Sequence, residues 1–170
     1  MSIEICTTDK PKTLRIGLIG PNWRDPVILK KFNSEAYNNA ITKFNDYLND
    51  YLKTTNLDKS NIILISNGSP WIDYITMQLY MDGGYAGIEL YIPSDFNVKA
   101  HKFTNTHEGR TLNQIHEQFS KIMGFDSLNV IEHIYSSKIK KMIKRGYTQC
   151  STLMNNNCDI FIEFKLDDFV

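Results

Sequence analysis

The fold is decided by the stretch Asn61-Ile-Ile-Leu-Ile-Ser-Asn-Gly-Ser-Pro70. Its unbroken aliphatic run is typical of a strand that is buried on both faces of a parallel sheet. Asn67-Gly-Ser-Pro70 has the composition of a turn, and Pro70 suits the first position of a helix because that position needs no backbone N–H. The stretch therefore indicates a strand, a tight turn and a helix over residues 71–82, which together form part of a βαβ unit.

The sequence on both sides continues this alternation of strands and helices. We expect strands over residues 14–20, 61–66, 87–92 and 158–164, with helices over residues 34–53, 71–82, 112–123, 127–136 and 148–156. Ser34 is the expected N-cap of the first helix. Residues 94–110 are polar and are expected to be irregular, and Ile3–Cys6 is either part of a loose lead-in or an edge strand. This order predicts an α/β protein, a Rossmann-like three-layer sandwich whose mainly parallel sheet of about four to six strands is flanked by helices.

Length and composition fit one globular domain. The chain has 170 residues, of which 42% are apolar and 22% charged, enough to bury a core without disulfide or metal staples. We expect a lead-in over residues 1–12, one domain over 13–164 and a tail over 165–170. Because 19 basic residues balance 19 acidic ones, nucleic acid is a partner that we do not favour.

Cysteine and histidine spacing argues against a metal site, and we expect no cofactor. The three cysteines form no C-x-x-C pair, and no two of the four histidines have metal-ligand spacing. The N-terminus does not resemble a signal peptide, and no segment is long and apolar enough to span a membrane. A cytoplasmic protein is expected. The bias toward Asn, Ile, Lys and Tyr is typical of AT-rich genomes, such as those of some parasites, large viruses or low-GC bacteria. If the chain is viral, we expect it in the cytoplasm of the host cell.

Ligands of open parallel α/β sheets bind outside the carboxyl ends of the strands, so the turns there supply the candidate binding residues. Gly68 allows close backbone approach, and the helix that follows presents N–H groups to an anion. Arg24 is either a phosphate clamp or a surface arginine beside Asp25. The candidate ligand-binding residues of the first two turns are Gly20, Asn22, Arg24, Asn67, Gly68 and Ser69.

Four further features could take part in chemistry, and three of them allow two interpretations. Asp73 either contacts a ribose or base, or simply stabilises the helix N-terminus, which is the simpler interpretation of the residue alone. His116 is either a base or a histidine that packs within its helix, and Cys150 is a weak nucleophile candidate without a partner in the sequence. The basic stretch 138–145 either binds phosphate groups or, as we favour, is the solvated face of an amphipathic segment.

The runs Ile63–Tyr80 and Gly87–Pro93 resemble the SLOG superfamily. These Rossmann-like domains include the cytokinin-activating LOG phosphoribohydrolases and DNA-processing protein A. The residues in matching positions of the strand–turn–helix motif and of the following strand are Ser66, Gly68, Trp71, Asp73 and Pro93. A second segment, Gly109–Ser120, is similar to one of an SLOG-like branch through Thr111, Asn113, His116, Phe119 and Ser120.

The resemblance implies a pocket for a nucleotide or nucleotide-derived small molecule and a homodimer. Thr111 and Asn113 would close the pocket from the next helix. The LOG phosphate and catalytic motif is absent, and Cys150-Ser151 stands where an Arg-Asn pair is expected. Binding is therefore the first hypothesis. An N-glycosidic hydrolase with Asp73 or His116 as general acid or base is the second, and an interaction protein that has lost the ligand is the third.

Overall fold

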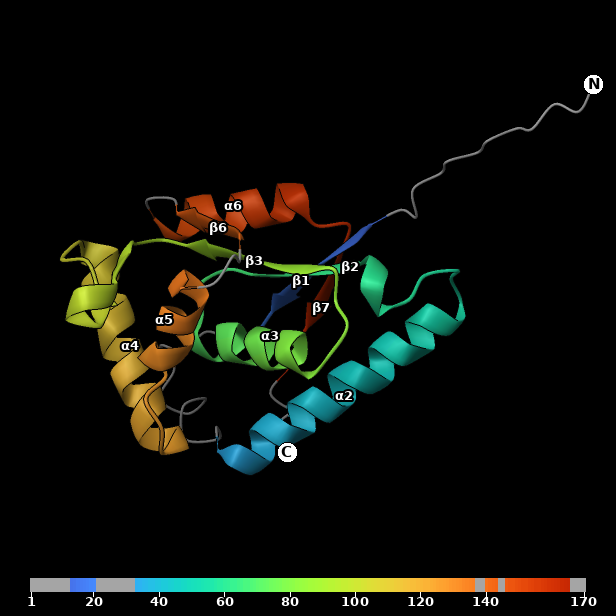
Figure 1. The fold of residues 1–170 in the computed structure, drawn as a ribbon, viewed down its shortest axis with the longest axis horizontal. Helices are drawn as coiled ribbons and strands as arrows, with labels where there is room; N and C mark the ends of the chain where they lie inside the picture. Colours follow the sequence, from blue (N-terminus) through green and yellow to red (C-terminus); the bar gives the residue numbers. More distant parts are fainter. Residues whose placement is uncertain (1–12, 21–32, 137–139, 144–145, 166–170) are drawn as a thin grey trace, which may run out of the picture.

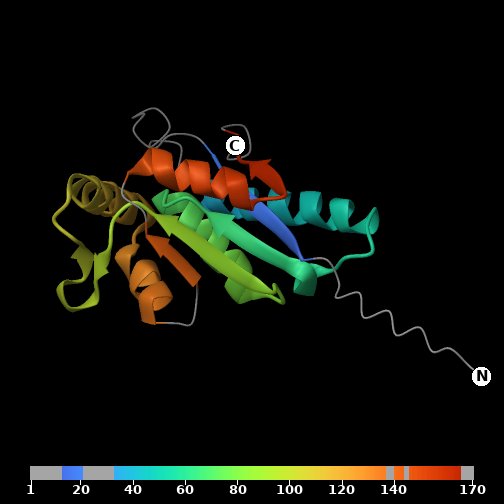
Figure 2. The ribbon, with the colours of Figure 1, turned by 90° about the horizontal axis from the view of Figure 1, so that it is seen from above.

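A five-stranded parallel sheet forms the centre of the protein (Figures 1 and 2). The computed structural model describes residues 13–20, 33–136, 140–143 and 146–165. Along the sheet the strand order is β6-β3-β2-β1-β7, and every neighbouring pair is parallel. A two-stranded antiparallel hairpin, β4-β5, stands apart from this sheet. The predicted α/β class with a mainly parallel sheet is confirmed.

The strands of the structure are β1 (Leu14–Ile19), β2 (Ile62–Ser66), β3 (Gly87–Ile92), β4 (Phe96–Asn97), β5 (Lys102–Phe103), β6 (Lys140–Ile143) and β7 (Ile160–Glu163). The α-helices are α2 (Ser34–Lys53), α3 (Pro70–Asp82), α4 (His107–Met123), α5 (Leu128–Ser136) and α6 (Tyr147–Asn157). Two short 3-10 helices, η1 (Lys59–Asn61) and η2 (Val98–Ala100), precede β2 and β5.

The direction of the chain through the sheet explains the layers. From β1 the chain moves through β2 and β3 to β6 in one direction, then returns to β7 on the far side of β1. Because parallel crossovers are right-handed, helices of the outward path share one face of the sheet and the helix of the return path covers the other. Figures 1 and 2 show α6 alone on one face and α2 and α3 on the opposite face, with α4 and α5 beside α3.

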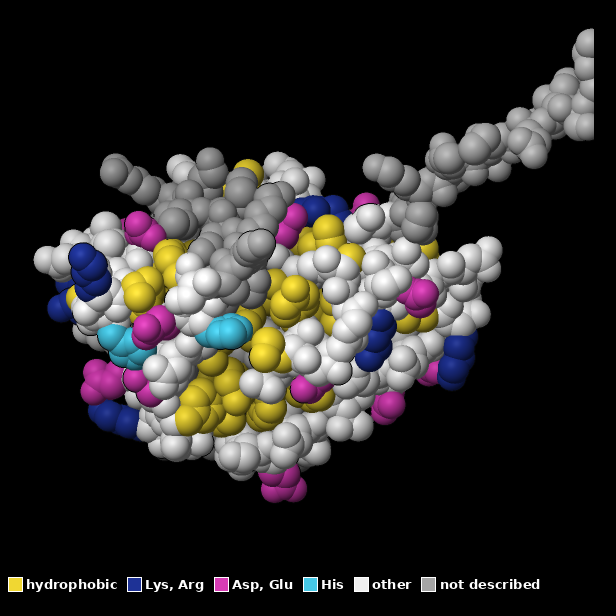
Figure 3. Space-filling model, in the orientation of Figure 1, with side chains coloured by type: hydrophobic (Ala, Val, Ile, Leu, Met, Phe, Trp, Pro, Cys, Tyr) yellow, Lys and Arg dark blue, Asp and Glu magenta, His cyan; other side chains and the backbone are white. Residues whose placement is uncertain are grey.

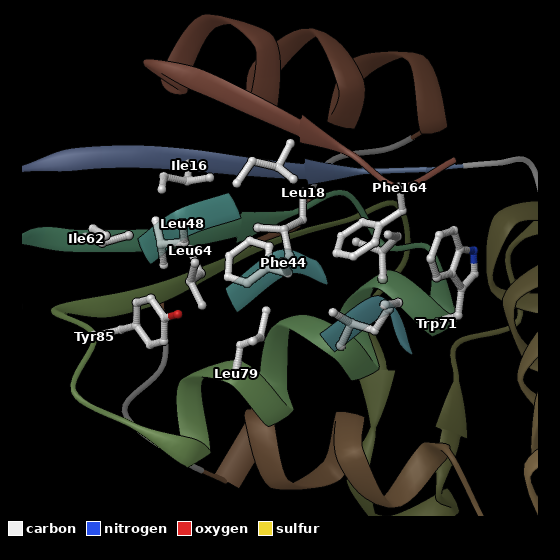
Figure 4. Packing of buried hydrophobic residues seen from close by; sticks show 14 of the residues in the cluster. Ile16, Leu18, Phe44, Leu48, Ile62, Leu64, Trp71, Leu79, Tyr85 and Phe164 are labelled. Carbon is white, nitrogen blue, oxygen red and sulfur yellow. The ribbon is translucent and has the colours of Figure 1, made fainter. Parts of the chain in front are cut away.

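The larger core lies between the sheet and the helices α2 and α3 (Figure 4). Ile16, Leu18 and Leu64 from the sheet are fully buried there against Phe44 of α2. On the other face, Ile65 and Tyr91 pack against Cys150 and Met154 of α6. Strands buried on both faces carry aliphatic residues at successive positions, which is why β1, β2 and β3 were predictable.

Three details differ from the prediction. The N-cap of α2 is Asn33, whose side chain accepts a hydrogen bond from the Ala36 N–H, so the expectation of Ser34 was wrong. Residues 94–110 contain the β4-β5 hairpin and the first turn of α4 rather than irregular chain. Residues 140–143 form strand β6, which the sequence did not predict. The suggested strand at Ile3–Cys6 lies outside the described residues.

The face seen in Figure 3 carries charges of both signs around a hydrophobic area between α5 and α2. Acidic and basic side chains are interspersed over this face. No helix among the described residues has the length and apolarity needed to cross a membrane.

Candidate functional site

The carboxyl ends of the strands form the edge at which α2, α3, α4 and α6 begin. In an open parallel sheet this edge is where ligands bind, and the crevice opens where the strand order reverses. The reversal here lies between β1 and β7. Gly20 and the turn Asn67–Ser69 therefore lie at the predicted edge, and Asn22 and Arg24 fall outside the described residues.

Gly20 at the end of β1 lies directly against the indole of Trp71 in α3. A Cβ at this position would overlap with the ring atoms of Trp71 and would lie 3.2 Å from Ile72. The absent side chain thus lets the backbone at the end of β1 approach the first turn of α3. Gly20 itself is exposed, so this backbone is accessible at the edge.

The turn between β2 and α3 is held from inside by Asp73. Its carboxylate accepts hydrogen bonds from the Ser66 hydroxyl and, over 3.2 Å, from the Gly68 N–H. Gly68 has φ +85°, and a Cβ there would lie 2.9 Å from Cδ of Pro93, so the turn requires glycine. Asp73 is only 2% exposed, and this burial raises its pKa to about 7. In the described structure Asp73 shapes the turn and does not face solvent.

The first turns of the helices at this edge differ in how they are capped. Asn33 caps α2 and Thr106 caps α4 through side-chain hydrogen bonds. Ser69 before α3 and Gly146 before α6 make no such bond. The orphan N–H groups of a first turn must find other partners, and the helix dipole favours an anion. Among these four helices, α3 and α6 are thus the two whose first turns have no side-chain cap.

The start of α4 is fastened to the segment after β3. The Ser94 hydroxyl lies 3.0 Å from the Thr104 hydroxyl and 2.9 Å from that of Thr106. Gly109 packs so closely that a Cβ there would overlap with the Thr104 carbonyl. A Cβ at Gly146 would lie 3.9 Å from Glu108, so the starts of α4 and α6 are neighbours.

The side chains of Thr111 and Asn113 are engaged in local structure. The Thr111 hydroxyl donates to the His107 carbonyl one turn earlier. Asn113 accepts from the Phe103 N–H at 2.9 Å and donates to the Phe103 carbonyl at 3.2 Å, so it fixes β5 to α4. The closing of a pocket by these two side chains stays a prediction.

His116 is buried in a small serine network between α4 and the start of α5. It is 1% exposed, its Nδ1 lies 2.8 Å from the Ser127 hydroxyl, and its ring lies against Phe103. Desolvation lowers its pKa to about 3, so the imidazole is neutral at pH 7. Its Nε2 is buried with no hydrogen-bond partner among the described residues. In the described structure no hydrogen bond joins His116 to Asp73, and their catalytic roles stay predictions.

Neither of the described cysteines is a reactive thiol. Cys150 of α6 is fully buried against the sheet. Burial raises the pKa of Cys158 to about 11, which keeps it protonated at neutral pH. The described part of the chain also contains no group of three or more His, Cys, Asp or Glu residues that could hold a metal ion.

Sequence reasoning missed the start of α6 as a component of this edge. Gly146 has φ +91°, a conformation that favours glycine, and it connects β6 to the helix. The pattern of strand, glycine and helix is the same signal that identified the β2–α3 turn. It went unrecognised because β6 was not predicted as a strand.

A comparison with known proteins gives a viral relative. The chain is 31% identical over 156 residues to "Uncharacterized protein R261" of Acanthamoeba polyphaga mimivirus, covering 91% of this chain and 83% of the mimivirus protein. The chain belongs to the family of this mimivirus protein. No protein-family model and no solved structure matches the chain. A viral relative agrees with the expectation drawn from the Asn-, Ile- and Lys-rich composition.

Proposed function

We propose that the protein binds a nucleotide or nucleotide-derived small molecule at the carboxyl edge of its sheet, with an anionic group at the start of α3 or α6. The observation that carries the proposal is the contrast in capping. Side chains cap α2 and α4, whereas α3 and α6 begin without a side-chain cap at the same edge. A phosphate or carboxylate is favoured at the start of a helix by the helix dipole and the backbone N–H groups there.

The local backbone supports this assignment. Gly20 brings exposed main chain, rather than a side chain, to the edge beside the first turn of α3. A glycine in the first βα turn, where strand and helix pack closely, is typical of phosphate-binding turns in Rossmann-like folds. The SLOG resemblance of the residues around this turn points to the same ligand class, and it remains part of the proposal.

Binding is preferred over N-glycosidic hydrolysis because both catalytic candidates are occupied inside the fold. Asp73 has the pKa of a useful general acid, about 7, but its Oδ1 already serves Ser66 and Gly68. His116 is a neutral, buried imidazole with a pKa of about 3. A general base must reach the proton that it removes, and neither side chain is exposed in the described structure.

The first test is a thermal-shift screen against nucleotides, nucleotide sugars and ADP-ribose-type molecules. A ligand present at a hundred times its Kd adds about 2.7 kcal/mol to the free energy of unfolding. Ser69→Asp then separates binding from stability. A negative charge at this N-cap stabilises α3 by about 0.3–1 kcal/mol through the helix dipole but repels an anion there. The unliganded melting temperature should therefore rise while the ligand-induced shift shrinks.

Asn49→Asp is the matched control because it adds the same charge on the exposed face of α2, away from this edge. It should leave the ligand-induced shift unchanged. A flat screen across all ligand classes, or a shift that Ser69→Asp and Asn49→Asp reduce equally, would contradict the proposed site.

A further inference from the structure

The β4-β5 hairpin meets the rest of the molecule through two different kinds of contact. At its base, Phe96 and Phe103 are buried in a core shared with α4 and α5, and Asn113 of α4 binds the backbone of Phe103. At its tip, the 3-10 helix η2 ends at His101, which is 35% exposed and contacts two carboxylates. Packing therefore holds the base of the hairpin, whereas charge holds its tip.

Both ring nitrogens of His101 face a carboxylate. Nδ1 lies 2.6 Å from Glu132 of α5, and Nε2 lies 2.8 Å from Asp126 in the turn between α4 and α5. An ionised carboxylate only accepts hydrogen bonds, so each nitrogen must carry a hydrogen, and the imidazolium is the form of histidine that carries both. The neighbouring charged residues of the hairpin itself, Lys99 and Lys102, are exposed.

His101 also has a backbone conformation that needs support from its surroundings. Its φ of +49° makes it the one residue other than glycine with a positive φ in the described part of the chain. A residue with a Cβ is strained in this left-handed region and stays there only where its contacts hold it. The contacts here are the two carboxylates, the Phe96 ring at 6.0 Å from the imidazole, and the Val98 carbonyl, which accepts from the His101 N–H.

From this geometry we propose that His101, Asp126 and Glu132 form a proton-controlled clasp, which closes the tip of the β4-β5 hairpin onto α5 and the α4–α5 turn while His101 is protonated. Loss of the proton leaves a bare nitrogen lone pair facing a carboxylate, so one of the two attractive contacts becomes repulsive. The tip then opens as a local unit, because the base of the hairpin stays packed.

The direction of the pH dependence follows from the contacts of the clasp. The hydrogen bond to Asp126, followed by that to Glu132, raises the pKa of His101. The clasp is therefore closed below the ordinary histidine value of about 6.5 and opens as pH rises through the raised pKa. It does not depend on the ligand proposed above.

Asp126 connects the clasp to a neighbouring hollow. Its Oδ2 faces His101, while its Oδ1 accepts from the Leu128 N–H at 2.9 Å, so one carboxylate joins the hairpin tip to the start of α5. A hollow of about 480 Å³ adjoins this turn and is lined by Asp126, Leu128 and residues of α4. When the clasp opens, Asp126 loses its cationic partner, and the wall of the hollow becomes more negative.

NMR spectroscopy of the labelled full chain between pH 5.5 and 9 tests the clasp directly. The ¹⁵N shifts of the His101 imidazole report its protonation. Order parameters from ¹³Cα relaxation report the mobility of the tip without relying on hydrogens that exchange with water. For residues 98–101 they should fall from about 0.85 to below about 0.6 with the midpoint of the imidazole titration, while the order parameter of Phe103 stays near 0.85.

Three substitutions separate charge from backbone conformation. Glu132→Gln should lower the midpoint of both the titration and the loosening, whereas Glu163→Gln, the same change on the edge strand β7, is the matched control and should leave both unchanged. His101→Asn keeps a residue that tolerates the left-handed region but removes the charge, so the tip should be mobile at every pH. A tip that stays ordered while the imidazole titrates, an ordered tip in His101→Asn, or an unchanged midpoint in Glu132→Gln would each overturn the proposal.

Discussion

Replacing Asp73 by Asn should remove the pH dependence of stability that this carboxyl imposes. Burial raises the pKa of Asp73 from 3.8 to about 7 in the folded protein. An unfolded chain releases the proton near the ordinary value, so unfolding becomes easier as pH rises from about 4 to about 7 and the loss levels off above that range. The folded protein therefore gains most from Asp73 in its protonated form.

The magnitude follows from the pKa difference. A rise of about three pH units corresponds to about 4 kcal/mol between the protonated and ionised states. Asp73→Asn removes this titration, since its carbonyl oxygen can still accept from the Ser66 hydroxyl and the Gly68 N–H. The new NH₂ group takes the place of a carboxyl oxygen at a buried position. Its hydrogen-bond donors are left unsatisfied there, which costs about 1–3 kcal/mol of stability. Asp73→Asn should thus be less stable than wild type at pH 4.5 and about 1–3 kcal/mol more stable at pH 8.

Urea denaturation at pH 4.5, 6 and 8 measures this crossover directly. Asp46→Asn, on the exposed face of α2, is the matched control and should show no crossover. If Asp73→Asn lost more stability at pH 8 than at pH 4.5, the ionised carboxylate would be the form that the fold requires. The reasoning from burial would then be refuted.

Two other substitutions test local contacts. Gly109→Ala should lower the free energy of unfolding by about 1–3 kcal/mol by overpacking against Thr104, although alanine normally favours a helix; a stabilised variant in thermal unfolding would show that α4 can shift. His101 lies 2.6 Å from Glu132 and 2.8 Å from Asp126, and its hydrogen bond to Asp126, followed by that to Glu132, raises its pKa. The stability that it adds is complete below pH 6.5 and is lost as pH rises through the raised pKa, so His101→Gln should destabilise the protein at pH 5.5 and change it little at pH 9, measured by urea denaturation.

The parts of the fold that were predictable are those in which burial dictates residue type. β2 and β3 are buried between two layers of helices, and their sequences are correspondingly aliphatic. β6 (Lys140–Ile143) was missed because it is an edge strand of the sheet. Lysine is common on edge strands, where it discourages pairing with another chain, so the sequence here lacks the aliphatic run of a central strand. The hairpin over residues 96–103 was missed because its two-residue strands carry too short a pattern to detect.

The candidate site was predictable in position but not in the partners of its side chains. The turn after β2 was correctly placed because Gly68 and Pro70 have strong local preferences. The burial of Asp73 and the bonds between Asn113 and Phe103 depend on contacts between segments that sequence spacing does not encode. The capping difference between helices was likewise invisible until Gly146 was placed at the start of α6.

The two ends of α6 give a physical reason to expect the ligand at the carboxyl edge. At its C-terminal end, Arg15 of β1 donates to the Asn157 carbonyl at 2.5 Å and forms a two-pronged ion pair with Glu89 of β3, at 3.1 and 2.5 Å. This guanidinium neutralises the negative end of the helix dipole within the protein. No side chain caps the positive end at Gly146. The lack of a side-chain cap at the starts of α3 and α6 is therefore the feature of the carboxyl edge that supports the proposed anionic ligand there.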